Sequence, residues 1–262
     1  MCSAAVPYNT YTTNGDGRIQ QTQTAYLPYE TITKFGEEAL NGASDMCVAD
    51  DGLIYVADTG NSRIVVGNLK GELVKIIGTD VLKTPKGVYV TSNGHVYVAD
   101  RDAEAVFEFD ADGTLLNTYG RPNSPLYGDD NSYLPIKIVV NEGGTMFIIC
   151  ESNTNGIVEI APTEGGTFLG YFGTNFASKS LRTIIYRAIL TDAQRAKMVS
   201  NLPATPDNLA VNSKGLIYTV TRGDGAETIK LLNIAGANIY TTSVEPSVPT
   251  AIASGNYDNV IV

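Results

Sequence analysis

Carboxylate, amide and ammonium side chains share one repeated position in this 262-residue sequence, seven residues before each of four glycines. Asp45 and Asn208 occupy it in the first and fourth copies, and Gly87 and Lys137 occupy it in the second and third. Carboxylate and amide oxygens are the ligands that Ca²⁺ prefers. The ammonium of Lys137 would repel a cation held among them. The set therefore predicts a polar binding site, with a calcium ion as the weaker alternative.

Asp58 and Asp100 end the segment YVAD in the first two copies, and each precedes a short polar loop. Aspartate side chains accept hydrogen bonds from the backbone N–H groups of a following turn, and they also pair with arginine. We expect both carboxylates to stabilise their loops, with Asp58 paired to Arg63. They are also candidate binding residues, because their loops fall at the same end of the predicted sheets as the Asp45 set.

Histidine and cysteine offer little further chemistry. His95 is the single histidine, and it falls in a predicted hairpin turn away from Asp45. A three-histidine zinc site and a Ser-His-Asp arrangement are both excluded on that basis. Cys2, Cys47 and Cys150 lie far apart, and the last two fall inside predicted strands, which favours buried thiols over a disulfide framework. We predict no catalytic residue, no transition metal and no cofactor within the chain.

The elements that must position these residues come from an internal repeat. Each copy has a turn glycine followed three residues later by Tyr or Phe, and a proline or alanine stands nine residues before the glycine. The glycines are Gly52, Gly94, Gly144 and Gly215, and the upstream residues are Ala43, Pro85, Pro135 and Pro206, with a fifth copy opening at Pro249. The upstream residues lie 42, 50, 71 and 43 residues apart. A period near 42 with four short strands per copy is typical of a β-propeller, one copy forming one blade.

Alternating apolar residues and turn pairs locate the strands. In the first copy they predict strands over 45–49, 53–57, 63–69 and 73–77, and in the second an outer strand over 114–119. The inner strands are nearly continuous apolar runs, as expected where neighbouring blades cover both faces. The alternative is a β-sandwich whose sequence is periodic by chance.

Two insertions exceed the base period. The first covers Gly120–Pro135, and the second lies between Gly173 and Pro203, where residues 174–202 include two predicted helices, 180–190 and 191–200. Thr191 with Gln194 matches a capping box. In a four-stranded meander, the loops between strands two and three share a face with the loops between blades. We therefore expect both insertions and the Asp45 set on one face, with Tyr127 and Tyr133 at its surface as binding residues.

Composition narrows the class of partner. The formal net charge is −10, and the sequence pI is about 4.6. Nucleic-acid binding needs a basic footprint, so nucleic acid is not expected. No run of 18 apolar residues is present, so no transmembrane helix is expected. The start, MCSAAVPY, resembles the end of a trimmed secretory signal, and the alternative is an ordinary cytosolic start. We expect residues 1–28 to be a signal remnant and a tyrosine-rich polar leader.

The repeat resembles the NHL family of β-propellers. The resemblance rests on Pro85-x-Gly87, on YVAD at 55–58 and 97–100, and on Asp58-x-x-Asn61-x-Arg63-Ile64. It is strong in the first two copies and weak in the next two, where Phe147–Cys150 and Tyr218–Thr221 replace YVAD. The whole chain looks similar to secreted bacterial NHL-repeat proteins of unassigned function. This resemblance implies an all-β propeller over residues 29–262, six-bladed when complete.

The count of predicted strands indicates a partial ring. Residues 29–36 match the outer strands of later copies without the other three strands of a blade, and the fifth copy ends inside its second strand. A bare blade face would expose apolar side chains at a cost of about 10–20 kcal/mol. We therefore expect the sequence to be a fragment of a longer protein.

Three functions remain open. The first is a secreted or cell-surface binding module for a protein or glycan, without catalytic activity. The second is a metal-assisted lyase or lactonase-type hydrolase whose remaining ligands lie in further blades. The third is a purely structural component of the cell envelope.

Overall fold

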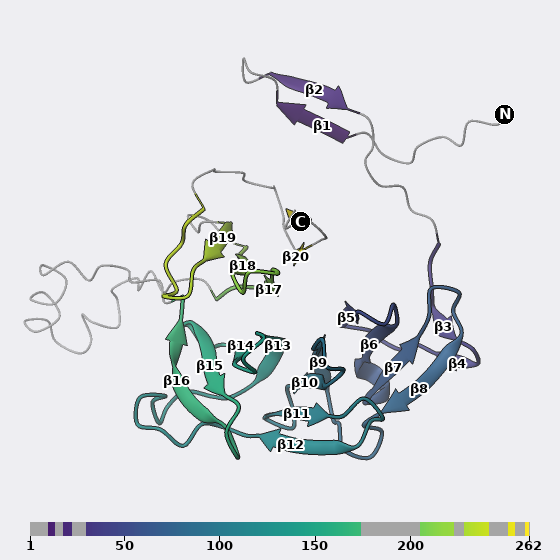
Figure 1. The fold of residues 1–262 in the computed structure, drawn as a ribbon, viewed down its shortest axis with the longest axis horizontal. Coiled ribbons are helices and arrows are strands. Elements are labelled where there is room, and N and C mark those ends of the chain that lie inside the picture. The colour runs from purple at the N-terminus through teal and green to yellow at the C-terminus, as the bar shows by residue number, and fades with distance from the viewer. Residues whose placement is uncertain are drawn as a thin grey trace, which may run out of the picture.

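The computed structural model describes residues 10–13, 18–22, 30–173, 205–222, 228–240, 251–254 and 260–261. Their sheets form an open arc of blades, with the first strand of each blade innermost, toward the axis where a complete propeller has its channel (Figure 1). The two helices predicted between residues 174 and 202, and the signal remnant at the start, lie outside the described residues. No helix in the described part is long and apolar enough to cross a membrane.

The blades are antiparallel meanders. Blade one contains β5 (Asp45–Val48), β6 (Ile54–Asp58), β7 (Arg63–Gly67) and β8 (Leu73–Ile77). Blade two contains β9 (Pro85–Val90), β10 (Val96–Asp100), β11 (Ala105–Phe109) and β12 (Leu115–Tyr119). Blade three contains β13 (Pro135–Val140), β14 (Met146–Cys150), β15 (Ile157–Ala161) and β16 (Thr167–Phe172). Blade four has three described strands, β17 (Asn208–Val211), β18 (Ile217–Val220) and β19 (Ile229–Leu232). The predicted all-β propeller is confirmed for these four blades.

The second strand of each blade lies at the centre of the packing. All residues of β6, β10, β14 and β18 are buried, because each strand has a blade neighbour or a covering segment on both faces. A hairpin turn precedes each of these strands, with glycine at the positive φ that the turn requires, as at Gly52 (φ 79°) and Gly94 (φ 85°). Cys47 and Cys150 lie in β5 and β14 as free thiols, and Cys150 is buried as predicted, whereas Cys47 is only partly buried.

The core consists of one apolar layer between each pair of successive blades. Between blades one and two, Ile64 and Ala57 pack with Val88 and Val96. Between blades two and three, Val106 packs with Ile138 and Met146, and a similar layer joins blades three and four. Each blade is thus stabilised by apolar contacts with its neighbours, as in other repeat proteins.

The chain before blade one forms a hairpin instead of the predicted outer strand over 29–36. Only Lys34–Phe35 is a strand there (β3), and it pairs with β4 (Glu38–Ala39). Gly36 takes φ 56° and turns the chain into β4, which is two residues long, so only Lys34 and Phe35 have ladder partners. Phe35 is buried against Ile54, Val56 and Val65, so the hairpin covers the outer half of the free face of blade one.

The inner half of that free face is exposed. Met46 is 61% and Val48 57% exposed. The counterparts of Met46 in blades two and three, Val88 and Ile138, are 1% and 0% exposed, and those of Val48, Val90 and Val140, are 9% and 2% exposed. The later blades bury this position against a preceding blade, which blade one lacks in the described structure.

Two short sheets complete the described strands. The strands β20 (Ala253–Ser254) and β21 (Val260–Ile261) pair with each other, and β20 lies beside β17, where the fifth copy is predicted. The hairpin of β1 (Thr10–Thr13) and β2 (Ile19–Thr22) stands apart from the arc in Figure 1.

Candidate functional site at the channel mouth

An ion pair joins blades one and three at the mouth of the channel. Lys137 Nζ lies 2.5 Å from Asp45 Oδ1, and both side chains are largely buried, at 15% and 11% exposed. The other carboxylate oxygen of Asp45 accepts the backbone N–H of Val88 at 3.0 Å. Asp45 therefore binds the innermost strand of blade two and the lysine of blade three at once. Three of the four repeated positions of the predicted polar site, 45, 87 and 137, lie together.

Gly87 makes this contact possible. A Cβ atom at position 87 would lie 2.9 Å from the carbonyl oxygen of Ile136 and 2.9 Å from Cα of Lys137. Real Cβ atoms do not approach backbone atoms that closely, so β9 and β13 can lie this near each other only with glycine here. Packing therefore requires glycine at position 87, and this close packing allows Lys137 to reach Asp45.

The mouth residues do not fit a calcium ion. Asp45 already has Lys137 and the Val88 N–H as partners. The side-chain oxygen of Asn208 accepts the backbone N–H of Leu209 at 2.8 Å. A cation among them would have to displace an ammonium held at 2.5 Å. Across the described residues, no three His, Cys, Asp or Glu side chains gather as a metal would require.

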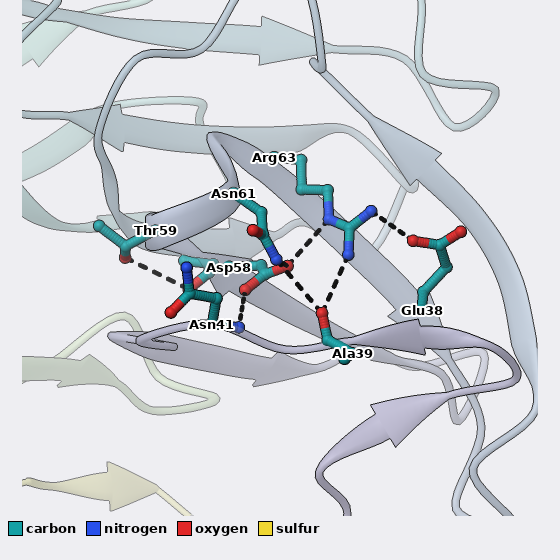
Figure 2. A network of polar contacts seen from close by, with 8 residues as sticks. Glu38, Ala39, Asn41, Asp58, Thr59, Asn61 and Arg63 are labelled. Carbon is teal, nitrogen blue, oxygen red and sulfur yellow. Dashed lines mark hydrogen bonds and ion pairs between the residues drawn. The ribbon is translucent and has the colours of Figure 1, made fainter.

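Asp58 is the centre of a buried polar network (Figure 2). Its carboxylate is fully buried and accepts the Asn41 backbone N–H at 2.6 Å, the Asn61 amide at 2.8 Å and Arg63 Nε at 2.9 Å. Arg63 also binds Glu38 at 2.6 Å and the carbonyl of Ala39 at 3.1 Å. Burial would lower the pKa of Arg63, but the bonds to Asp58 and Glu38 outweigh that effect and raise it. The predicted Asp58–Arg63 pair is present, and it fastens the β3–β4 hairpin to blade one.

Asp100 stabilises the corresponding loop of blade two. It is fully buried and accepts backbone N–H groups from Lys83 at 2.7 Å, Thr84 at 2.9 Å and Ala103 at 3.0 Å. Lys83 and Thr84 belong to the segment that enters blade two, so the carboxylate joins the entry of the blade to its β10–β11 loop. The predicted loop-stabilising role of Asp58 and Asp100 agrees with these bonds.

The loops between second and third strands lie beside the entries to the blades, as the meander predicts. Thr59 Oγ1 donates to the carbonyl of Pro85 at 2.6 Å, and the Glu151 N–H donates to the carbonyl of Leu134 at 2.8 Å. Thr205 Oγ1 similarly donates to the carbonyl of Asn153 at 2.9 Å. The first insertion ends at Pro135 on this same face, called the mouth face from here on. The second insertion lies outside the described residues.

Charged side chains beside the mouth were missed among the site residues chosen from the sequence. Arg101 forms ion pairs with Glu151 of blade three and with Asp102, and its two partners are about half exposed. The hydrogen bond from Arg101 lowers the pKa of Glu151, and bonds from Thr84 and Arg101 lower that of Asp102. Lys86 Nζ lies 3.4 Å from Ser44 Oγ. Arg101 directly follows YVAD at 97–100, so its place at the start of the β10–β11 loop could have been predicted from the sequence.

Tyr127 and Tyr133 are buried, so the prediction that they lie at the surface is wrong. They are 0% and 1% exposed. Tyr127 packs edge-on against Tyr133 and Phe168 and stacks on Tyr171. Aromatic rings bury a large apolar area, and the insertion is long enough to fold both back onto blade three. The tyrosines anchor the insertion and leave other residues at its surface.

His95 belongs to a polar cluster away from the mouth. Its Nδ1 lies 2.8 Å from Glu108, whose carboxylate also accepts hydrogen bonds from Tyr97, Tyr119 and Asn117. Burial would raise the pKa of Glu108, but these four partners lower it overall. The sequence placed His95 in a turn, but the cluster was not predicted, because its members come from three strands.

Comparison with known proteins agrees with this fold. The family model for the NHL repeat matches residues 40–66 and 82–109, in blades one and two. No curated protein sequence matches the chain.

Several solved structures share the fold. A streptogramin B lyase aligns at 16% identity with a TM-score of 0.52, over 96% of this chain and 68% of the lyase. A virginiamycin B lyase from Staphylococcus aureus aligns at 15% identity and TM-score 0.51, over 96% of this chain and 69% of its own. A protein described as a putative gluconolactonase gives 16% identity and TM-score 0.56, over 95% of this chain and 74% of its own.

Identities this low establish a shared fold and no shared activity. The chain is therefore a β-propeller protein that carries NHL repeats in blades one and two.

Proposed function

We propose that this chain is a secreted or cell-surface binding module that holds a protein or carbohydrate ligand on its mouth face and catalyses no reaction. The observation that carries the proposal is the pairing of the mouth carboxylates. Asp45 is held by Lys137, and Asp58 and Asp100 are buried under three hydrogen bonds each. A general acid or base needs access to substrate. These carboxylates instead make the loops rigid.

The side chains around this framework suit recognition. Lys83 is exposed, and Lys86, Arg101 and Glu151 are partly exposed on loops anchored at their bases. Rigid loops that present charged groups lose little conformational entropy when a ligand binds. Opposite charges in close array also favour polar ligands with matching charges.

The test is a binding screen with a charge reversal on each face. Purified protein is applied to arrays of glycans and of immobilised proteins, alongside Lys83→Glu/Lys86→Glu and the control Lys70→Glu. Lys70 is exposed in the β7–β8 turn, at the opposite end of the blades. We expect the mouth-face variant to lose binding and the control to retain it. Equal binding by both variants would contradict the proposal.

The second candidate is a metal-assisted lyase or lactonase-type hydrolase. It is favoured by the fold neighbours described as lyases and as a putative gluconolactonase. The mouth residues do not supply a fitting cation site, so this activity would need ligands from further blades. Turnover of a lactone or of a streptogramin by a chain carrying such blades, and its loss with chelator, would favour this candidate over the first.

The ring itself is proposed to be six-bladed. The exposed pair Met46 and Val48 supports further blades, because the equivalent residues of blades two and three are buried by a preceding blade. A further blade that covered Met46 and Val48 would remove two large apolar side chains from water, and each would stabilise the protein by about 1.5–3 kcal/mol. If the present chain binds a hydrophobic dye, and Met46→Lys binds less of it, this face of blade one is open to solvent. A chain with the further blades should bind little dye.

A further inference from the structure

The first insertion is folded around the guanidinium of Arg121. Arg121 donates to three backbone carbonyls of the same loop: Asn131 at 3.1 Å, Gly128 at 2.8 Å and Asp129 at 3.0 Å. It also lies over the ring of Tyr127, with its Cζ 5.1 Å from the ring centroid. The residues from 120 to 134 are called the Arg121 loop below.

Tyrosine hydroxyls anchor the loop from its buried side. The Tyr127 hydroxyl donates to the carbonyl of Ser132 at 2.7 Å. The Tyr171 hydroxyl of β16 donates to the carbonyl of Tyr127 at 2.6 Å, and the Asn131 amide contacts both residues. A loop with this many internal bonds holds one shape, so little conformational entropy remains to be lost when it is bound.

The tip of this rigid loop is apolar and exposed. Leu126 is 78% exposed, and Pro125 beside it is also exposed. Asp129 and Asp130 are exposed two and three residues beyond the buried Tyr127. The loop therefore buries its aromatic residues and presents a proline–leucine pair next to two carboxylates. The repeat does not require this arrangement, because the loop is an insertion between blades.

We propose that the Arg121 loop is a preformed docking loop, and that its partner is a protein with an apolar pocket rimmed by lysine or arginine. The pocket would receive Pro125 and Leu126, and the basic rim would pair with Asp129 and Asp130. A leucine placed in an apolar pocket contributes through its removal from water, while the charge pairs orient the partner. The net charge of −10 adds long-range attraction for a basic partner. This inference rests on the proposed binding function of the mouth face and names the kind of ligand.

A library of disulfide-constrained peptides displayed on phage provides a defined probe. Selection against the wild-type protein is followed by affinity measurement of the enriched peptides against the Lys83→Glu/Lys86→Glu variant described above and three further variants. Leu126→Asp removes the apolar tip, and Asp129→Lys/Asp130→Lys reverses the charges. Leu69→Asp is the matched control, because Leu69 is 71% exposed in a turn at the opposite end of blade one.

We expect enriched peptides to combine aromatic or aliphatic residues with lysine or arginine. Their affinity should fall about tenfold or more with Leu126→Asp and should stay within about twofold with Leu69→Asp. The charge reversal should weaken binding and reduce its dependence on salt. Circular dichroism of each variant checks that the fold is retained, as expected for exposed positions.

The outcomes separate this inference from the proposed function. Peptides or arrayed glycans that bind Leu126→Asp normally but lose affinity for Lys83→Glu/Lys86→Glu would overturn the docking loop and leave the mouth face as a binding surface. Ligands whose affinity changes neither with the variants of the Arg121 loop nor with Lys83→Glu/Lys86→Glu would overturn both proposals. Enriched peptides without basic residues would contradict the proposed partner.

Discussion

Lys137 and Asp45 pair across an entire blade: the lysine extends from β13, the carboxylate from β5, and β9 of blade two lies between them. Their 2.5 Å contact depends on the missing side chain of Gly87, whose backbone β13 approaches closely. The residue types at positions 45, 87 and 137 therefore form a single structural unit, although they are 92 residues apart at their extremes.

Replacement of Gly87 by alanine should destabilise the protein. The new Cβ would lie 2.9 Å from two backbone atoms, which cannot rotate away, so β9 and β13 must separate. Overpacking of this kind costs about 1–3 kcal/mol of unfolding free energy, measurable by urea denaturation. Gly120→Ala is the control, because its Cβ would meet no atom within 4 Å. Equal stability of the two variants would show that the strands can move apart freely.

Removal of the Asp58 carboxylate should be among the most damaging single changes at the blade ends. Asp58→Ala would leave Arg63, itself 13% exposed, without its buried partner and the Asn41 N–H without an acceptor. Breaking a buried pair from one side costs about 3–5 kcal/mol. Thermal unfolding of Asp58→Ala measures this loss of stability. Asp102→Ala is the control, because the Asp102 carboxylate is 48% exposed. A small effect at position 58 would mean that water replaces the network readily.

Tyr127 and Tyr133 should respond differently to loss of their hydroxyls. The Tyr127 hydroxyl bonds to Ser132, so Tyr127→Phe should cost about 1 kcal/mol. Among the described residues the buried Tyr133 hydroxyl has no hydrogen-bond partner, so Tyr133→Phe should leave stability unchanged or raise it. Chemical denaturation of the two variants provides the comparison. If Tyr133→Phe proves the more harmful change, that hydroxyl has a partner in solution.

The Glu108 cluster should make stability fall at acidic pH. Burial raises the pKa of Glu108, but its hydrogen bonds lower it below the ordinary value, so the folded state favours the ionised form. Its contribution is present above the unfolded pKa of about 4.3 and is lost as pH falls through the lower, folded pKa. Melting temperatures measured across this range should show a smaller acid-induced decrease for Glu108→Gln than for the wild type.

Glu159 occupies the position in blade three that matches Glu108, but its pKa is shifted in the opposite direction. Burial raises its pKa, so the folded state favours the protonated form, and this preference is lost as pH rises through the folded pKa. Glu159→Gln should therefore raise stability at neutral pH, where Glu108→Gln lowers it. The same sign for both variants would contradict the assignment of the two environments.

The sequence was sufficient for the repeat and its register, because alternation and turn glycines are local signals. Thus the strands at 73–77 and 45–48 match their predicted ranges to within one residue. The Asp58–Arg63 pair was also predictable, since five residues across a tight loop bring the ends of β6 and β7 together. Loop-stabilising aspartates follow from that spacing.

Contacts between distant segments were not predictable in the same way. Burial of Tyr127 depends on Phe168 and Tyr171 of a strand some 40 residues later. The strand expected over 29–36 is shortened to Lys34–Phe35, which pairs with the two-residue strand β4 after the turn at Gly36 and not with a strand of a blade. The Glu108 cluster likewise needs three strands aligned before its members meet. For Tyr127 and for the Glu108 cluster, the decisive partners lie on other strands, distant in sequence.

The bond from Lys137 to Asp45 bears on how the blades unfold. In a stack where each repeat touches only its neighbours, stability is a sum of nearest-neighbour terms, and single repeats can open independently. A contact from the first blade to the third adds a stabilising free energy that is lost when any one of the three blades opens. Blades one to three should consequently melt as one cooperative unit, while blade four, described without such a tie, can open by itself. Amide hydrogen exchange would then report a shared opening energy for β6, β10 and β14 and a lower one for β18.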